Sequence, residues 1–408
     1  MPVNLKRPDI DSILNISGIN LSTATSNLKY NNRKDLALIF LDKGSVVAGV
    51  FTKNQFLAAP VEIAKSHLNF EPNKRALVIN TGSANAGTGE KGLKDAREIC
   101  QALASELKID MKDVLPFSTG VIMTFLPTKK IKKSIPLLVE NLSPNNWLDA
   151  AEAIMTTDTT PKVISTSGFI DDSKINITGI SKGSGMINPN MATMLAFIGT
   201  DANISPQMLN ELTKEVVQNT FNRISVDGDT STNDSFIVVA TNKTNLNQIK
   251  TKNKQYKILK ALIMDVASHL AQAIVRDGEG ATKFIQIIVE EGRSEEECHN
   301  VAKVIANSPL VKTAFFASDP NLGRILAALG NAQISDLDIS LVNIYLNEVQ
   351  FAKKGSIAPH FDESYGKKEM LKDEISLKIL LGRGRANCTM WTTDLSYDYI
   401  KINSEYRT

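Results

Sequence analysis

Cysteine and histidine are scarce in this chain, although many catalytic and metal-binding sites depend on them. Its 408 residues include 3 Cys and 4 His. The cysteines, Cys100, Cys298 and Cys388, are odd in number and far apart, which excludes a disulfide framework and a four-cysteine zinc site and fits a reducing cytosol. Only Cys298 and His299 are adjacent, and neighbouring residues on a helix do not converge on one metal ion. An enzyme of this composition needs a nucleophile and a base other than the usual histidine-assisted pair.

Excess charge and long apolar runs are also missing. The 46 Lys+Arg and 44 Asp+Glu leave a net charge of +2, which argues against the concentrated basic face of a nucleic-acid binder. No run of about 18 apolar residues occurs, so we expect no membrane span, and residues 1–8 show no apolar core of a signal peptide. These absences predict a cytoplasmic protein with no nucleic-acid or membrane partner and no metal or prosthetic group.

Strand and helix signals alternate along the chain, which predicts an α/β or α+β fold of layered sheets and helices. Apolar runs predict strands over residues 36–41, 46–51, 75–80, 163–169, 175–180, 194–198, 236–240, 284–289, 341–346 and 375–381. Helices are expected over 93–107, 206–221, 255–276 and 295–306, with N-caps at Ser205 and Ser294. Turn residues at 42–44 and 171–172 predict two hairpins. The length allows two or three domains, and the lack of a long linker predicts that they pack together.

A glycine-rich segment, Gly87 to Gly92, matches the GxGxxG pattern of dinucleotide-binding loops. The first glycine of such a loop follows the strand directly, but here it comes seven positions after Asn80. Leu93 also stands where a phosphate-binding P-loop needs lysine. Dinucleotide binding is therefore a disfavoured alternative, and a glycine-rich surface loop is the favoured interpretation.

The segment from Lys182 to Asp201 is the strongest candidate for chemistry. A loop rich in Gly, Asn and Pro leads to Ala192 and Thr193, and an apolar strand follows. Attack of the Thr193 hydroxyl on the preceding carbonyl, followed by hydrolysis, would release a new N-terminus, and the α-amine of a chain terminus ordinarily has a pKa of about 7.7–8.0. That amine can serve as the base for its own hydroxyl. Alternatively, Thr193 is an ordinary β-branched residue at the start of a strand.

The same segment, KGSGMINPNMATMLAFIGTDA, closely resembles the self-cleavage segment of the ArgJ family, the ornithine/glutamate N-acetyltransferases of arginine biosynthesis. Further blocks that resemble this family follow in order over the chain, at residues 80–86, 118–122, 154–159, 276–283, 319–321 and 402–408. The ordered set is far more specific than any one motif, and it identifies the chain as similar to this family from end to end.

The resemblance implies cleavage between Ala192 and Thr193 into an alpha chain, 1–192, and a beta chain, 193–408. It implies a layered α-β-β-α fold of the DmpA/ArgJ type with both chains interleaved, and a heterotetramer of two alpha and two beta chains. Thr193 would take acetyl from N-acetylornithine and pass it to glutamate in a ping-pong reaction. No cofactor is implied, although some members of the family also use acetyl-CoA as a donor.

Two residues match the family's oxyanion hole, and a third matches one of its substrate-binding residues. Thr119 and Gly120 would stabilise the negative charge that develops on the carbonyl oxygen. Lys182 would bind a substrate carboxylate. Without the resemblance, the first two would be interpreted as a turn after a strand and Lys182 as a solvated loop residue.

The remaining substrate-binding residues implied by the resemblance are Thr156, Glu279, Asn403 and Thr408. Thr156 has a similar neighbour, Thr157, with which it is easily confused. Glu279 would hold a cationic amine, and Asn403 and Thr408 belong to a tail that returns to the active site. The alternatives are a polar loop for Thr156, an exposed acid after a helix for Glu279, and a frayed terminus for the tail.

The chain departs from the family pattern at four positions near these residues. Ser83 and Gly87 stand where the family more often has Asn and Cys, and Met123 and Thr124 replace a usual Gly-Glu pair. These departures leave every proposed site residue intact but affect the fine geometry of the substrate site. A self-processed amidohydrolase or aminopeptidase, which would transfer the acyl group to water, is the alternative function.

Overall fold

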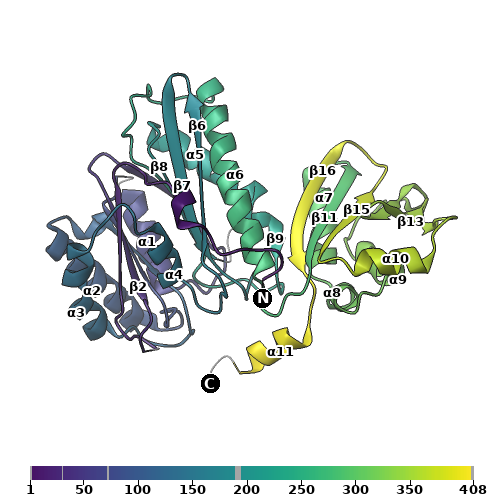
Figure 1. The fold of residues 1–408 in the computed structure, drawn as a ribbon, viewed down its shortest axis with the longest axis horizontal. Helices are drawn as coiled ribbons and strands as arrows, with labels where there is room; N and C mark the ends of the chain where they lie inside the picture. The colour runs from purple at the N-terminus through teal and green to yellow at the C-terminus, as the bar shows by residue number, and fades with distance from the viewer. Residues whose placement is uncertain (1, 30, 71–72, 189–193, 406–408) are drawn as a thin grey trace. The chain divides into compact units, whose positions relative to one another are not determined.

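The computed structural model describes residues 2–29, 31–70, 73–188 and 194–405. The chain divides into two compact units. The large unit comprises Arg7–Asn222 and Asp229–Ile274, and the small unit comprises Met1–Lys6, Arg223–Gly228 and Val275–Thr408. Each unit has a hydrophobic core of its own, and each is described by itself (Figure 1).

Two sheets form the centre of the large unit. The four-stranded sheet has the order β1 (Ile19–Ala24), β2 (Leu36–Leu41), β4 (Ala76–Asn80) and β5 (Val114–Ser118). The five-stranded sheet has the order β3 (Val46–Phe51), β10 (Ser235–Ala240), β8 (Leu195–Thr200), β7 (Ser173–Lys182) and β6 (Lys162–Ile170). Most of these strands are apolar on both faces, as strands are when both faces of a sheet are covered.

A shared core lies between the two sheets. Phe117 of β5 and Phe197 of β8 meet edge to face across it, with 5.0 Å between ring centroids. Helices α1 (Ala59–Phe70) and α4 (Trp147–Ala153) each contact strands of both sheets and contribute to this core.

Helices cover the outer faces of both sheets. The outer residues of β2, β4 and β5 pack on α2 (Gly89–Leu107) and α3 (Thr128–Glu140), while α5 (Pro206–Asn219) and α6 (Lys254–Arg276) cover the five-stranded sheet. The large unit therefore has the predicted α-β-β-α layers, visible on the left of Figure 1.

The five-stranded sheet combines strands from both sides of residue 192. β8 and β10, which follow that position, lie between β3 and β7, which precede it. The chain passes between the compact units at other positions, after residues 6, 222, 228 and 274. Residues before and after position 192 thus share one core.

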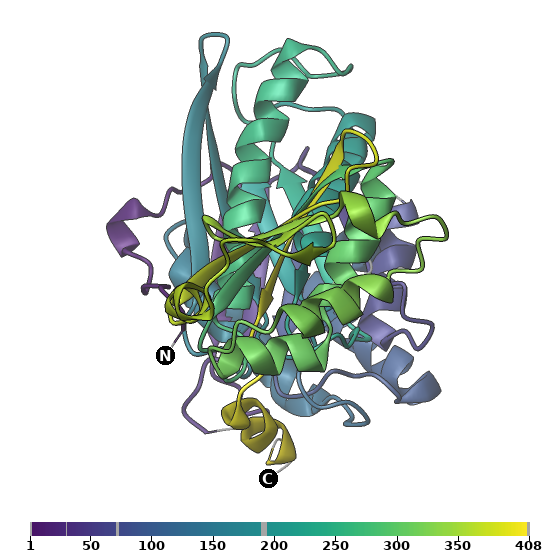
Figure 2. The same ribbon diagram turned by 90° about the vertical axis from the view of Figure 1, so that its right-hand side faces the viewer.

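Helix α6 lies along the β6–β7 hairpin (Figures 1 and 2). Two glycines of the hairpin allow the close approach: a Cβ at Gly168 would meet Leu262, and one at Gly179 would meet Leu270, both at 2.9 Å. Among the described residues, α6 alone is long and apolar enough to cross a membrane by length and composition. Half of that apolar window is buried inside the protein, as in the core helix of a globular domain.

The small unit is built on a seven-stranded mixed sheet. Its strand order is β14 (Ser356–Ile357), β13 (Val349–Lys353), β12 (Asn343–Leu346), β15 (Glu374–Leu380), β11 (Phe284–Gly292), β16 (Ala386–Thr393) and β9 (Ile224–Ser225). Its helices are α7 (Glu295–Ala306), α8 (Pro309–Phe316), α9 (Leu322–Gly330), α10 (Glu363–Met370) and α11 (Tyr397–Ser404). The apolar face of β11 packs with α7, α8 and α9 in one core.

One of the two predicted hairpins is wrong. The strands at 36–41 and 46–51 exist, but β2 pairs with β1 and β4, whereas β3 pairs with β10 in the other sheet. Both runs are apolar because they face the shared inner core from opposite sheets. The hairpin around Asp171 and Asp172 is confirmed as β6–β7.

The two predicted helix N-caps are confirmed. The Ser205 side chain accepts a hydrogen bond from the Met208 N–H at the start of α5. Ser294 likewise accepts from the Glu297 N–H at the start of α7. The Glu297 carboxylate reaches back to the N–H of Arg293, one residue before the cap.

Candidate active site

The candidate oxyanion hole lies where two parallel strands end side by side. β4 ends at Asn80 and β5 at Ser118, which are register partners. The Ser118 hydroxyl donates to Asn80 Oδ1 at 2.6 Å, and the Thr119 N–H donates to the Asn80 carbonyl oxygen at 2.9 Å. The loop that begins at Thr119 is therefore fixed to the end of the neighbouring strand.

Gly120 occupies a position that only glycine fits. Its φ is +131°, and a Cβ there would lie 2.5 Å from the carbonyl carbon of Gly82 in the adjacent loop. The amide of Asn233 holds the two loops together by donating to the carbonyl oxygens of Ala84, at 2.6 Å, and Ser118, at 2.9 Å. Such rigid backbone is what an oxyanion hole requires, because its donors must be in place before charge develops.

Lys182 is the last residue of β7 and is buried, with 9% of its surface exposed. Its Nζ donates to Thr119 Oγ1 at 3.3 Å. Its register partner is Leu195, the first residue of β8. The interpretation of Lys182 as a solvated loop residue is wrong, and the predicted oxyanion-hole threonine and the predicted substrate lysine lie together.

A buried aspartate that sequence reasoning missed organises the segment containing Thr156. The side chains of Asp158 and Lys162 are both fully buried and form an ion pair at 2.7 Å. The carboxylate also accepts from the N–H of Gly183, at 2.7 Å, and of Thr156, at 3.0 Å. Asp158 therefore joins the Thr156 segment to the residue that follows Lys182.

Burial alone would raise the pKa of the Asp158 carboxyl. The positive charges of Lys162 and Lys182 and the hydrogen bond from Gly183 outweigh this effect and hold the pKa well below its usual range.

Thr157 has a different role from Thr156, because its hydroxyl lies 2.7 Å from that of Ser184. The two neighbouring threonines are thus distinguished by the structure.

The predicted cleavage site, Ala192 and Thr193, and the predicted terminal ligand Thr408 lie outside the described residues. Met194 is the first described residue after the cleavage site, and its carbonyl oxygen accepts a hydrogen bond from the Ser235 N–H at 2.9 Å. β8 begins one residue later, as the apolar run predicted.

Glu279 and Asn403, the two described site residues of the small unit, are in direct contact. Asn403 lies on α11, and its amide donates to Glu279 Oε2 at 2.8 Å. Glu279 is 9% exposed, so the interpretation of it as an exposed acid is wrong. Gly280 follows with a φ of +67°, and its carbonyl oxygen accepts from Ser396 Oγ at 2.6 Å, which ties the turn to the start of α11.

The predicted surface position of the Gly87–Gly92 segment is confirmed at Gly87 and at Gly89 to Lys91, which are exposed, whereas Thr88 and Gly92 are buried. The predicted loop is shorter than expected, because α2 begins at Gly89. The Asn85 amide donates to the carbonyl oxygen of Gly92 at 3.0 Å, and the Thr88 hydroxyl donates to Asn85 Oδ1 at 2.8 Å. The loop is filled by its own side chains, and it follows a strand of a mixed sheet, so neither feature fits dinucleotide binding.

Two of the departures from the family pattern touch each other. A Cβ at Gly87 would lie 3.1 Å from the Cγ of Met123. Met123 has a φ of +63°, a conformation that suits the glycine usual there. Glycine thus stands at position 87, where the family more often has a larger residue, and a larger residue stands at position 123, where glycine is usual. Thr124 contributes its backbone carbonyl, which accepts from Ser83 Oγ at 2.6 Å.

The three cysteines are buried and free, and none has the environment of a nucleophile. Burial raises the pKa of the Cys100 thiol to about 12 and that of Cys388 to about 11. No cluster of three or more potential metal ligands occurs within the described residues.

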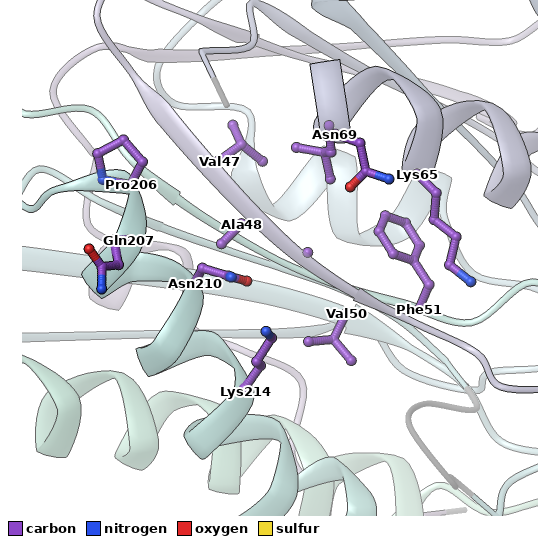
Figure 3. Close-up of a pocket in the computed structure, with 12 residues that line it drawn as sticks. Val47, Ala48, Val50, Phe51, Lys65, Asn69, Pro206, Gln207, Asn210 and Lys214 are labelled. Carbon is purple, nitrogen blue, oxygen red and sulfur yellow. The ribbon is translucent and has the colours of Figure 1, made fainter. Parts of the chain in front are cut away.

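A groove of about 580 Å³ follows the edge strand β3 on the large unit (Figure 3). It is lined by β3, α1 and α5, with Lys65 and Lys214 among its polar residues. None of the proposed site residues lines this groove.

Comparison with known proteins shows the family of the chain. The ArgJ family model matches residues 20–408. The chain is 50% identical to the arginine biosynthesis bifunctional protein ArgJ of Colwellia psychrerythraea and 51% identical to that of Neisseria meningitidis, in each case over the full length of both chains. A crystal structure of the ArgJ protein from Bacillus halodurans is 34% identical, with a TM-score of 0.50 over 52% of this chain and 99% of that one. The chain therefore belongs to the ArgJ family.

Proposed function

We propose that this protein is a self-processing acetyltransferase that moves acetyl from N-acetylornithine to glutamate, producing ornithine and N-acetylglutamate. The observation that carries the proposal is the contact between Lys182 and Thr119 at the end of β7, opposite the start of β8. Thr193 precedes that strand by two positions. Membership of the ArgJ family supports the same function.

The proposed maturation makes the nucleophile and its base in one reaction. Thr193 Oγ bonds to the carbonyl carbon of Ala192, the peptide C–N bond breaks, and the hydroxyl proton passes to the departing nitrogen. Water then hydrolyses the ester and leaves a carboxylate on residue 192 and an α-amine on Thr193. The scarcity of His and Cys fits an enzyme whose base is this amine.

Acetyl transfer follows by the same chemistry. The amine takes the proton of Thr193 Oγ while the oxygen bonds to the acetyl carbon, and gives it to the ornithine nitrogen as the amide C–N bond breaks. Glutamate then attacks the acetyl ester with its amine and regenerates the free hydroxyl. The Thr119 hydroxyl and the Gly120 N–H stabilise the oxyanion in both half-reactions.

The other proposed residues bind the two amino-acid substrates. Lys182 pairs with the α-carboxylate that donor and acceptor share. Glu279 holds the cationic amine of the ornithine moiety, with Asn403 fixing the carboxylate of Glu279. Thr156 and Thr408 supply further polar contacts. Because donor and acceptor are similar, one pocket serves both half-reactions.

Three further features complete the proposal. The relatives at 50% and 51% identity are called bifunctional, which supports acetyl-CoA as a second acetyl donor. The chains 1–192 and 193–408 remain together in a heterotetramer of two of each, with a mass of about 89 kDa, twice the 44.6 kDa of one chain. The enzyme works in the cytoplasm without metal or prosthetic group.

The deciding assay supplies N-acetylornithine with and without glutamate. Without glutamate, a transferase of this kind releases at most one ornithine per active site, and it releases ornithine continuously, in step with N-acetylglutamate, only when glutamate is present. Ornithine release that does not depend on glutamate would show an amidohydrolase. Formation of N-acetylglutamate from acetyl-CoA and glutamate alone tests the second donor.

A further inference from the structure

Asp234 is a buried carboxylic acid that the mechanism above does not use. It is 3% exposed and directly precedes β10. Its backbone carbonyl accepts from the Thr52 N–H at 3.0 Å. The next residue, Ser235, pairs with Leu195 and donates its N–H to the Met194 carbonyl oxygen at 2.9 Å. These contacts hold Asp234 beside the first described residue after Thr193.

One oxygen of this carboxyl lacks a donor among the described residues. Oδ2 of Asp234 is buried and has no hydrogen-bond partner there. The carboxyl does accept hydrogen bonds from Ser231 and from the backbone of Met194. Buried acceptors are normally paired, so an unsatisfied one calls for an explanation.

The groups around the Asp234 carboxyl also stabilise its ionised form only in part. Burial raises the pKa of Asp234 well above its usual value, and the hydrogen bonds from Ser231 and the charge of Lys182 offset this only in part. Lys182, at the end of β7, is the charged residue of the described chain that acts on this carboxyl. A second cation beside Oδ2 would stabilise the ionised form.

We propose that the carboxylate of Asp234 receives the α-ammonium group that cleavage creates on Thr193 and holds that amine in position for acetyl transfer. This inference rests on the proposed cleavage. Thr193 is joined to Met194, whose backbone contacts the same carboxyl. Before cleavage its nitrogen carries one neutral peptide N–H, and afterwards it carries a cationic donor group.

Asp234 is thereby a positioning residue and takes no proton itself. The proton moves from Thr193 Oγ to the amine and then to the leaving nitrogen, while the carboxylate stabilises the ammonium form between these steps. A nearby negative charge favours the protonated amine and raises its pKa by about one to three units. Loss of the carboxylate must therefore lower the pH at which the amine becomes a base.

Asp201 provides a matched control at the other end of β8. It is 5% exposed, it directly follows the strand, and burial raises its pKa as well. Its carboxylate accepts from the Asn176 N–H at 2.9 Å. Asp201→Asn removes a comparable buried carboxyl next to the neighbouring strand of the same sheet, at the end remote from Met194.

The test compares Asp234→Asn and Asp201→Asn with the wild type, using cleaved protein and measuring kcat for acetyl transfer against pH. We expect Asp234→Asn to lower kcat at least about tenfold and to move the acid limb of the profile to lower pH by about one to three units. Asp201→Asn should leave the limb in place. An Asp234→Asn enzyme with the wild-type limb overturns the inference.

Two further variants keep the result interpretable. If Asp234→Asn does not cleave, the limb is measured in Asp234→Ser, which also removes the charge, and a wild-type acid limb in that variant also overturns the inference. Thr193→Ala tests the proposed function separately, because acetyl transfer by that variant would show that Thr193 is not the nucleophile. A normal Asp234→Asn profile beside an inactive Thr193→Ala enzyme removes only the role of Asp234.

Discussion

Lys182 Nζ lies 3.3 Å from Thr119 Oγ1. Lys182 is the last residue of β7 in the five-stranded sheet, whereas Thr119 directly follows β5 of the four-stranded sheet. The contact places a fixed positive charge beside a hydroxyl that precedes a glycine with a positive φ. A site of this composition can bind a carboxylate and stabilise an oxyanion at neighbouring positions.

Removal of the Thr119 hydroxyl should damage the chemical step. If it is an oxyanion donor, Thr119→Ala lowers kcat for acetyl transfer by about 10²–10³-fold. Thr124→Ala is the control, because Thr124 contributes a backbone carbonyl to the same pair of loops. A normal kcat in Thr119→Ala would show that the hydroxyl does not contact the developing charge.

Gly120→Ala should destabilise the whole large unit and not only the site. Its Cβ would lie 2.5 Å from the Gly82 carbonyl carbon in addition to adopting a φ of +131°. Gly44→Ala is the control, because Gly44 has a φ of +91° but nothing within 4 Å of the new Cβ. Thermal unfolding should show about 1–2 kcal/mol of backbone strain for Gly44→Ala and a clearly larger loss for Gly120→Ala. Equal losses would mean that the Gly82 contact is unimportant.

The buried pair of Asp158 and Lys162 should make stability depend on acid pH. The pKa of Asp158 is lower in the folded chain than the value of about 3.9 in the unfolded chain. Its stabilisation is therefore complete above that value and is lost as the pH falls below about 4 toward the folded-state pKa.

Asp158→Asn should accordingly cost about 3–5 kcal/mol at pH 7, because it leaves the buried Lys162 ammonium without its carboxylate. The difference from the wild type should shrink below about pH 4. Glu215→Gln, which disrupts pairs of a partly exposed glutamate, should cost less than about 1 kcal/mol. A difference that stays constant down to about pH 2 would contradict the assigned charge state.

Deletion of residues 403–408 should lower acetyl transfer while cleavage continues. The deletion removes the amide of Asn403 that contacts Glu279 Oε2 at 2.8 Å. We expect a raised KM for N-acetylornithine and a normal pattern of two chains on a denaturing gel. Lys401→Ala, on an exposed part of the same helix, is the control. Full activity in the truncated enzyme would exclude the tail from the site.

The sequence predicted where strands lie better than it predicted which strands pair in a sheet. The apolar runs at 36–41 and 46–51 are strands, but a turn between two strands does not reveal that they enter different sheets. The burial of Lys182 was equally hidden, since a lysine before a glycine-rich loop looks solvated until β8 is placed beside it.

The supporting residues were hidden for a related reason. The spacing of Asp158 and Lys162 is typical of an exposed helix pair, whereas here the chain leads into β6 and both side chains are buried. The need for glycine at position 120 comes from Gly82 in a separate loop, which no local pattern reveals. Family resemblance named the candidate site residues, and only the structure showed what holds those that it describes.

The most direct test of the account is intact mass and denaturing electrophoresis of the purified protein, combined with the acetyl-transfer assay. We predict two chains of about 21 and 24 kDa, in proportion to their 192 and 216 residues of the 44.6 kDa chain, with the larger one beginning at Thr193. Thr193→Ala should give one uncut and inactive chain. A wild-type chain that stays whole at 44.6 kDa and still transfers acetyl would contradict the account.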